Sequence, residues 1–172
     1  DSVMIDASHD NFRKNVKRTQ AVVERAKAKQ IFVEAELGVL SGVEDDISVD
    51  EKMAKYTHPD EALQFVNETQ CNSLAVAVGT SHGAYKFSGG QGIQFDILEK
   101  IQKLLPEFPL VLHGGSSVNH EEVNRINKSG GKLEKTASGV APEEIIKSIS
   151  YGICKINIAT DTRILWARIH RE

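Results

Sequence analysis

The sequence predicts an α/β fold, a parallel sheet that makes up about five-eighths of a closed (β/α)8 barrel. Five short apolar segments are each followed by a helical pattern of apolar residues, which is the repetition of a βαβ chain with right-handed crossovers. Two of these segments lead into a histidine–glycine pair. A closed barrel usually takes about 250 residues, so we expect the 172 residues of this chain to form a single domain with five of its strands.

The five predicted strands are short apolar runs bounded by turn or capping residues. They are residues 2–6, 31–38, 73–79, 110–113 and 153–158. Alternation in the second segment places apolar side chains on one face and Glu34 and Glu36 on the other. Because the apolar face would pack on helices, both glutamates would point into the barrel, where ionised groups need partners.

Capping residues and prolines delimit the predicted helices. The signals in chain order are Asp10 or Asn11, Pro59, the segment 95–105 stopped by Pro106, Asn119 with Glu122, Pro142, and the apolar stripe of Leu165, Trp166 and Ile169. Residues 39–46, between the second strand and the second helix, are predicted to be an acidic loop hinged at Gly42.

The composition indicates an ordinary soluble protein, with 40% hydrophobic and 26% charged residues. A net charge of −3 gives no indication of a nucleic-acid or membrane-surface partner. No apolar run approaches the roughly 20 residues of a membrane-spanning helix. Cys71 and Cys154 do not form a disulfide framework, which favours a reduced, cytoplasmic setting.

His82 and His113 follow two apolar strands and each precedes a glycine. The carboxyl ends of barrel strands form the face that carries the chemistry, so two histidines there are candidate ligands of a metal such as zinc. A catalytic zinc usually takes three protein ligands and an open position, and Asp6, Glu36 or a segment outside this sequence could complete the set. The alternative is that each histidine only hydrogen-bonds a loop.

Small and hydroxyl-bearing residues surround the same strand ends and suit a phosphate, because glycines let backbone amides approach an anion. They are Gly83, Gly114, Gly115, Ser116 and Thr160. Lys86 could neutralise the phosphate charge. The alternatives are turn geometry alone for the glycines and a solvated loop position for the lysine.

Two further residues could take part in catalysis. Glu44 could act as a general base if its loop closes over the site, although a solvated acidic loop is the simpler interpretation. Asn157 faces inward from a strand end and could donate a hydrogen bond to an enediolate oxygen. Its alternative role is to fill the barrel interior.

Five motifs together resemble the class II, zinc-dependent ketose-bisphosphate aldolases. In chain order they are Met4–His9, Glu34–Gly38, Ala77–Lys86, His113–Ser117 and Lys155–Ile158. The resemblance covers essentially the whole chain, and the motifs occur in the order of the family. It implies a (β/α)8 barrel of which this chain covers about strands 4–8.

The resemblance also implies a function. Enzymes of this family reversibly cleave fructose 1,6-bisphosphate, in glycolysis and gluconeogenesis, or its tagatose epimer. The products are dihydroxyacetone phosphate and glyceraldehyde 3-phosphate. The cofactors implied are a catalytic zinc ion and a monovalent cation, Na⁺ or K⁺, and the assembly implied is a homodimer or homotetramer.

The motifs assign roles to individual residues. His82 and His113 would be zinc ligands, Asp6 and Glu36 would belong to a second or alternative metal position, and Glu44 would transfer the proton at the dihydroxyacetone phosphate carbon. Gly83, Gly114, Ser116 and Thr160 would bind the phosphate, and Asn157 would contact the enediolate. These roles are implied by the resemblance.

The sequence departs from the family in two respects. A segment resembling His-Leu-Asp-His, with the third zinc histidine and an aspartate acid, would precede Asp1, and the first three βα units and a C-terminal tail are absent from this sequence. Ala159 stands where fructose-type enzymes usually have aspartate and tagatose-type enzymes have alanine, although Asp161 and the loop around Glu44 resemble the fructose group. Fructose bisphosphate is therefore the first expectation and tagatose bisphosphate the alternative.

Two other classes of function stay open. The chain could be a catalytically incomplete fragment that only binds sugar phosphate or zinc. It could also belong to a different phosphate-binding barrel enzyme, such as an isomerase.

Overall fold

A five-stranded parallel sheet forms the centre of the computed structural model, which describes residues 1–44, 47–49, 55–82, 92–135 and 138–171; the side chains of residues 41–44, 47–49 and 82 lie outside this description. The strands are β1 (Ser2–Ile5), β2 (Phe32–Leu37), β5 (Ser73–Val76), β7 (Leu110–Leu112) and β8 (Ile153–Ile156). They lie in this order, and each pairs in parallel with the next. This sheet is the partial (β/α) barrel that the sequence predicts.

Helices alternate with these strands, and their ends follow the predicted signals. They are α1 (Phe12–Lys27), α2 (Pro59–Thr69), α3 (Phe95–Leu104), α4 (His120–Lys128), α5 (Pro142–Ile149) and α6 (Thr160–Ile169). Asn11 caps α1 by accepting a hydrogen bond from the Lys14 amide, and Asn119 caps α4 by accepting from the amides of Glu121 and Glu122. Proline begins α2 and α5, where its missing N–H costs nothing.

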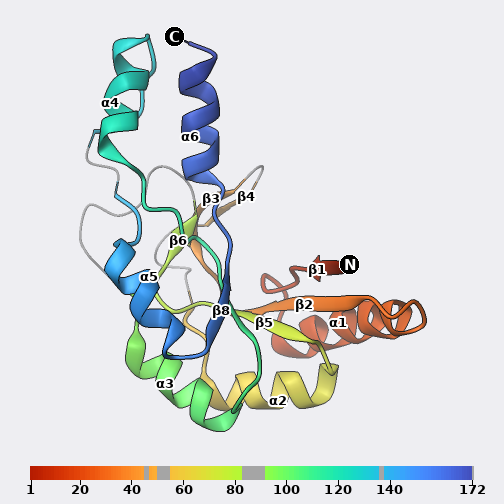
Figure 1. Ribbon diagram of the computed structural model, residues 1–172. Coiled ribbons are helices and arrows are strands. Elements are labelled where there is room, and N and C mark those ends of the chain that lie inside the picture. Colours follow the sequence, from red (N-terminus) through yellow and green to blue (C-terminus); the bar gives the residue numbers. More distant parts are fainter. Residues whose placement is uncertain (45–46, 50–54, 83–91, 136–137, 172) are drawn as a thin grey trace.

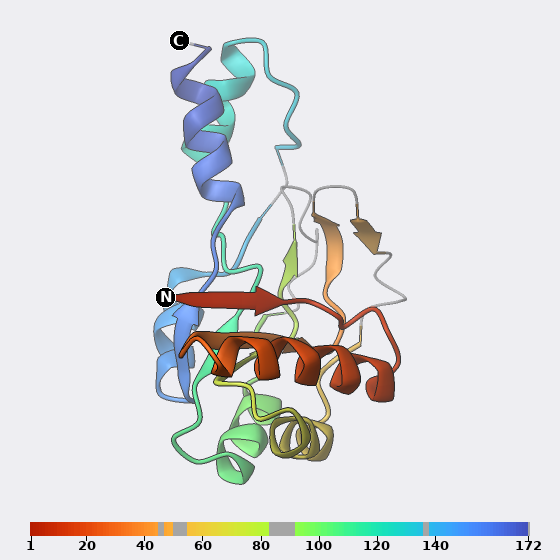
Figure 2. The same ribbon diagram turned by 90° about the vertical axis from the view of Figure 1, so that its right-hand side faces the viewer.

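The hydrophobic core lies between the sheet and a row of helices. Helices α1, α2 and α3 pack side by side along one face of the sheet (Figures 1 and 2). Ala35 and Leu37 of β2 project into this core, where Phe65 of α2 and Leu98 of α3 are fully buried. The alternation along β2 therefore has the predicted sense, and its glutamates point to the opposite face.

A second, smaller sheet corrects the predicted loop at residues 39–46. Strand β3 (Ser41–Glu44) pairs antiparallel with β4 (Ile47–Val49) and parallel with β6 (Ser81–His82). His82 consequently lies on its own short strand and not at the end of β5, which stops at Val76. The physical reason is that β2 and β5 are neighbours in the main sheet. The segments that follow them, β3 and β6, therefore also lie side by side and pair with each other.

Thr57 holds together the point where the two sheets separate. Its hydroxyl donates to the Leu37 carbonyl at 2.5 Å and accepts from the Ala77 amide at 2.8 Å, and its own amide donates to the Ala77 carbonyl at 2.9 Å. The side chain is 2% exposed. Gly38 lies against it with φ of 92°, and a Cβ there would come within 2.6 Å of the Ala77 Cβ. The ends of β2 and β5 are thus joined by a threonine.

Replacing Thr57 by valine is expected to lower the free energy of unfolding by about 1–3 kcal/mol, because the Leu37 carbonyl and the Ala77 amide would lose a partner in a dry environment. Thermal and urea unfolding would measure the loss. Thr57→Ser keeps the hydroxyl and should cost less than half as much. Equal losses in the two variants would contradict the assigned role of the hydroxyl.

Helices α4 and α6 form an arm that extends away from the main sheet (Figure 1). Val118, Val123, Ile126 and Ile164 form a separate buried cluster between them. Within the part of the chain that the structure describes, no helix has the length and apolar character needed to span a bilayer. The arm begins directly after the strand ends that carry the candidate site.

Candidate metal and phosphate site

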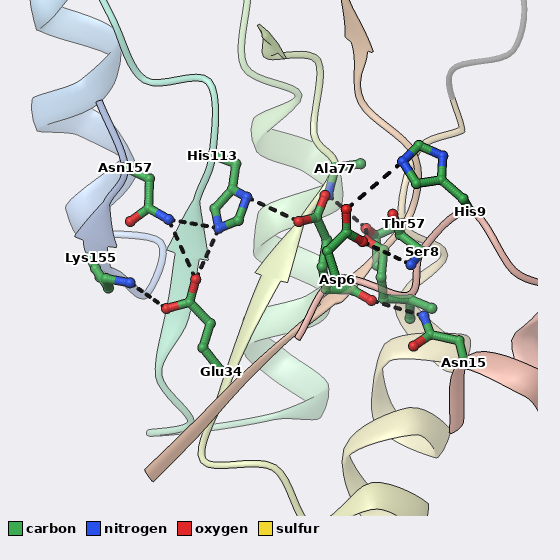
Figure 3. A network of polar contacts seen from close by, with 12 residues as sticks. Asp6, Ser8, His9, Asn15, Glu34, Thr57, Ala77, His113, Lys155 and Asn157 are labelled. Carbon is green, nitrogen blue, oxygen red and sulfur yellow. Dashed lines mark hydrogen bonds and ion pairs between the residues drawn. The ribbon is translucent and has the colours of Figure 1, made fainter. Parts of the chain in front are cut away.

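A buried imidazole lies between two buried carboxylates on the face of the sheet opposite the helices. His113 Nε2 is 2.9 Å from Glu34 Oε1, and His113 Nδ1 is 3.0 Å from Glu36 Oε2. The three residues are 6%, 5% and 3% exposed, respectively. Burial at this level requires that ionised groups have partners. Both carboxylates contact the imidazole of His113, and Figure 3 shows the contact with Glu34.

Three strands of the main sheet, β2, β7 and β8, place these groups, and β5 lies between β2 and β7. Glu34 and Glu36 alternate with apolar residues along β2, and His113 directly follows β7. Lys155 on β8 and Asn157 just beyond it share one face of their strand, since they are two residues apart. The expectation that both glutamates point inward to partners is confirmed.

Lys155 and Asn157 complete the network around Glu34. Lys155 Nζ lies 2.5 Å from Glu34 Oε2. Asn157 Nδ2 lies 2.9 Å from His113 Nε2 and 3.5 Å from Glu34 Oε1. The sequence pattern indicates a role for Asn157 but none for Lys155, although their two-residue spacing places both on one face.

The electrostatics of the network favour positive charge at His113. Burial alone would lower the pKa of His113, but hydrogen bonds to Glu34 and Glu36, with the charges of these carboxylates, outweigh burial and raise its pKa to about 9. Burial alone would raise the pKa of Glu34, but the hydrogen bonds from His113 and Lys155 lower it below its usual value. The network therefore favours an ionised Glu34 and a protonated His113.

Asp6 and His82 are the other predicted metal ligands. The Asp6 carboxylate accepts a hydrogen bond from the Ser8 amide at 2.9 Å and lies 3.8 Å from His9 Nε2 (Figure 3). The side chain of His82 lies outside the described residues. Among the described side chains, no three His, Cys, Asp or Glu residues form a group that could hold a metal. The structure thus brings His113 and Glu36 together and leaves the full ligand set a prediction.

The donor set at His113 fits zinc chemically. Imidazole nitrogen and carboxylate oxygen are both zinc ligands, and the ring here has a carboxylate at each nitrogen. Carboxylates that hydrogen-bond a liganding histidine are the usual support of such a ligand. A cation already suits the position, since the two glutamates favour the protonated imidazole.

The predicted phosphate residues 114–116 form a tight loop after β7. Gly114 has φ of 64°, and a Cβ on it would lie 2.5 Å from the Ser81 carbonyl oxygen, so only glycine fits. The Gly115 amide donates a hydrogen bond to the Asn157 carbonyl at 3.1 Å, so this N–H already has a partner within the protein. Ser116 is 2% exposed and its hydroxyl accepts from the Asp161 amide at 3.3 Å. Turn geometry therefore explains Gly114, and close packing explains Gly115, where a Cβ would lie 2.4 Å from Ile156 Cγ2. A phosphate contact by either glycine stays a prediction.

Asp161 is the residue that holds this loop in place. Its two carboxylate oxygens accept hydrogen bonds from the amides of Ser117 and Val118, each at 2.8 Å. Val118 has φ of 57°, a conformation that a branched side chain rarely adopts. This role of Asp161 is not predicted from the sequence. The available signal was an aspartate in the first turn of the last helix, but its partners lie more than 40 residues away.

The remaining predicted residues lie at the start of α6 or in parts that are not described. Thr160 is the first residue of α6, and Ala159 precedes it at the cap position. Glu44 ends β3, but its side chain lies outside the described residues, as do Gly83 and Lys86.

Comparison with known proteins gives a match over the whole chain. The family model described as "Fructose-bisphosphate aldolase class-II" matches residues 1–172. A fructose-bisphosphate aldolase of Thermus caldophilus is 51% identical over 171 residues, which cover 99% of this chain and 55% of that protein. A fructose-bisphosphate aldolase of Giardia intestinalis is 46% identical over 165 residues, covering 95% of this chain and 50% of that protein. This chain spans about half the length of the curated relatives it matches.

Solved structures agree with the sequence comparison. A crystal structure of a putative fructose-1,6-bisphosphate aldolase from Coccidioides immitis matches with a TM-score of 0.73 and 28% identity, over 99% of this chain and 52% of that one. The YdjI aldolase of Escherichia coli K12 matches with a TM-score of 0.59 and 30% identity, over 91% of this chain and 43% of that one.

Proposed function

This chain belongs to the class II fructose-bisphosphate aldolase family, a family of lyases, and on that premise we propose that its protein reversibly cleaves fructose 1,6-bisphosphate. The products would be dihydroxyacetone phosphate and glyceraldehyde 3-phosphate. The observation that carries the proposal is the buried His113 between Glu34 and Glu36, next to the tight loop at residues 114–116. We further propose that the chain supplies strands 4–8 of the barrel, within a cytoplasmic homodimer or homotetramer.

His82 and His113 would hold zinc, with Asp6 and Glu36 at a second or alternative metal position. When bound, the zinc ion would act as a Lewis acid that polarises the substrate ketone. Asn157 would donate a hydrogen bond from its side-chain amide to the substrate oxygen that gains negative charge during the reaction. Its side chain reaches the same side of His113 as Glu34, which supports this assignment.

Glu44 would move the proton at the dihydroxyacetone phosphate carbon. The register of the small sheet supports this role, because β3 pairs Gly42 with His82 two residues before Glu44. The proposed base and one proposed zinc ligand therefore lie on neighbouring strands. Gly83, Gly114, Ser116, Thr160 and Lys86 would bind the phosphate, with a monovalent cation, Na⁺ or K⁺, near the same loops.

A coupled cleavage assay tests the function. The longest natural form of the chain would be offered fructose and tagatose bisphosphates side by side, with and without a chelator. The proposal expects cleavage that prefers the fructose substrate and is lost when zinc is removed. Failure to cleave either substrate, in a protein that contains its upstream histidine and aspartate and has zinc bound, would contradict the aldolase function and leave a sugar-phosphate-binding protein.

Ala159 favours tagatose bisphosphate as the second candidate substrate. It is exposed at the cap of α6 and has no side-chain group that could contact a sugar hydroxyl. Ala159→Asp is expected to raise the ratio of kcat/KM for fructose over tagatose bisphosphate about tenfold, because an added polar contact discriminates between epimers. Ala159→Ser adds a shorter polar group and should shift the ratio less. An unchanged ratio in Ala159→Asp would mean that epimer choice lies elsewhere.

A further inference from the structure

The main-chain carbonyl of Glu36 points to the side of β2 on which the neighbouring strand has already ended. β1 pairs with β2 as far as Ile5, which lies opposite Ala35, whereas β2 continues to Leu37. The Leu37 carbonyl accepts a hydrogen bond from the Ala77 amide, on the β5 side. Because the carbonyls of successive residues in a strand point to opposite sides, the Glu36 carbonyl points to the β1 side, past the end of the β1–β2 ladder.

Asn15 of α1 supplies the hydrogen bond that β1 no longer offers. Its side-chain Nδ2 donates to the Glu36 carbonyl at 2.9 Å (Figure 3). Asn15 is 1% exposed, and a main-chain carbonyl in such a buried place needs a hydrogen-bond partner. The asparagine amide therefore takes the place that a strand amide would have in the ladder.

Thr19, one turn further along α1, determines which way round the Asn15 amide lies. Its hydroxyl donates to Asn15 Oδ1 at 3.2 Å, and its side chain is fully buried. Because Oδ1 is occupied by this donor, the amide presents its N–H group to the Glu36 carbonyl. The reversed amide would place one acceptor oxygen against another, and two acceptors cannot pair.

Side chains thus hold the end of β2 from both sides. On the β5 side, the Thr57 hydroxyl donates to the Leu37 carbonyl at 2.5 Å. On the β1 side, Asn15 donates to the Glu36 carbonyl. The Glu36 carboxylate, on a residue that is 3% exposed, lies 3.0 Å from His113 Nδ1. A shift of the main chain at Glu36 would move this carboxylate relative to the imidazole.

We propose that Asn15 is a positioning residue of the metal site, which holds the main chain of Glu36 so that its carboxylate stays beside His113. Thr19 supports Asn15 by fixing the orientation of its amide. This inference rests on the proposed zinc function. Asn15 touches neither the metal nor the substrate in this account, and it acts through the main chain of Glu36.

Zinc affinity of the full-length protein, measured by competition with a chelating dye, tests the inference. Asn15→Leu has a similar size but no donor, and it should weaken zinc binding about tenfold, as the loss of a group that holds a metal ligand does. Thr19→Val leaves the amide in place but removes its support, and it should weaken zinc binding about threefold. Thr19→Ser keeps the hydroxyl and should bind zinc within about twofold of the unsubstituted protein.

Thr69→Val is the matched control for stability. Thr69 is a buried threonine of α2, 2% exposed, and its hydroxyl donates to the Phe65 carbonyl at 2.7 Å. This variant should lower the urea midpoint of unfolding, as Thr19→Val does, but leave zinc affinity unchanged. If Thr19 only stabilised the fold, the two valine variants would bind zinc equally well.

Hydrogen exchange of the metal-free protein gives a second readout, which needs neither metal nor substrate. Mass spectrometry would follow peptides that contain residues 32–37, and the inference expects faster exchange there in Asn15→Leu than in Thr69→Val. If Asn15→Leu does not fold, Thr19→Val is compared with Thr19→Ser by the same two measurements.

Unchanged zinc affinity in Asn15→Leu, or exchange at residues 32–37 no faster than in Thr69→Val, would overturn the inference. Absence of zinc binding in the unsubstituted protein would instead contradict the proposed function. Hydrogen exchange would in that case still decide whether Asn15 holds the main chain of Glu36.

Discussion

Replacing His113 by alanine is expected to remove zinc binding and to lower kcat/KM by far more than 100-fold. Loss of an outer residue that supports a metal ligand costs about 10- to 100-fold, and His113 is itself the proposed ligand. Zinc content after dialysis and the cleavage assay would measure the two effects. His58→Ala, at the exposed start of α2, is the control and should leave both unchanged.

The same substitution should destabilise the metal-free protein. Glu34 and Glu36 would face each other across the space left by the ring, and each is at most 5% exposed. Removing one partner of a buried ion pair costs about 3–5 kcal/mol, and Lys155 and entering water would offset part of this. We expect a loss of about 3 kcal/mol in urea unfolding. An unchanged free energy of unfolding would mean that the carboxylates do not depend on His113.

The local pattern of the sequence predicts the fold, the inward direction of Glu34 and Glu36, and the place of His113 at a strand end. Alternation along β2 is a local property, so it shows which face carries Glu34 and Glu36 without knowledge of their partners. The apolar run before His113 is also a local signal, and it predicts a buried strand that ends at the histidine. Parallel strands then bring these side chains to the same edge, so the inward direction of both glutamates and the place of His113 could each be predicted. That His113 lies between the two carboxylates could not, because it depends on contacts between distant strands.

The features that sequence analysis missed depend on contacts between distant residues. Lys155 meets Glu34 from 121 positions away. The short strand at His82 exists only because β3 pairs with it, and nothing in the sequence around Gly79 indicates that pairing. A residue that holds another residue in place has no spacing pattern of its own, so only the three-dimensional arrangement reveals it.

Asp161→Asn is expected to lower kcat/KM about 10- to 100-fold while leaving zinc affinity unchanged, because it would displace the loop after β7 that we propose binds the phosphate, and so misplace the substrate. The aspartate accepts from two amides, Ser117 and Val118, with one oxygen each. An asparagine has one acceptor oxygen, and its amino group would face the second N–H. One amide of the loop would therefore lose its partner, and the left-handed backbone at Val118 would lose the bond that holds it.

The variant distinguishes the proposed phosphate loop from the proposed metal site. Both follow β7, but Asp161 hydrogen-bonds only the loop. We expect a rise in KM for the bisphosphate and a decrease of about 1–3 kcal/mol in the free energy of unfolding. Asp60→Asn is the matched control, an aspartate in the first turn of α2 whose side chain is 80% exposed, and it should change neither quantity. If Asp161→Asn weakened zinc binding as strongly as His113→Ala, the loop and the metal site would form one unit, and the phosphate role of residues 114–116 would lose its independent support.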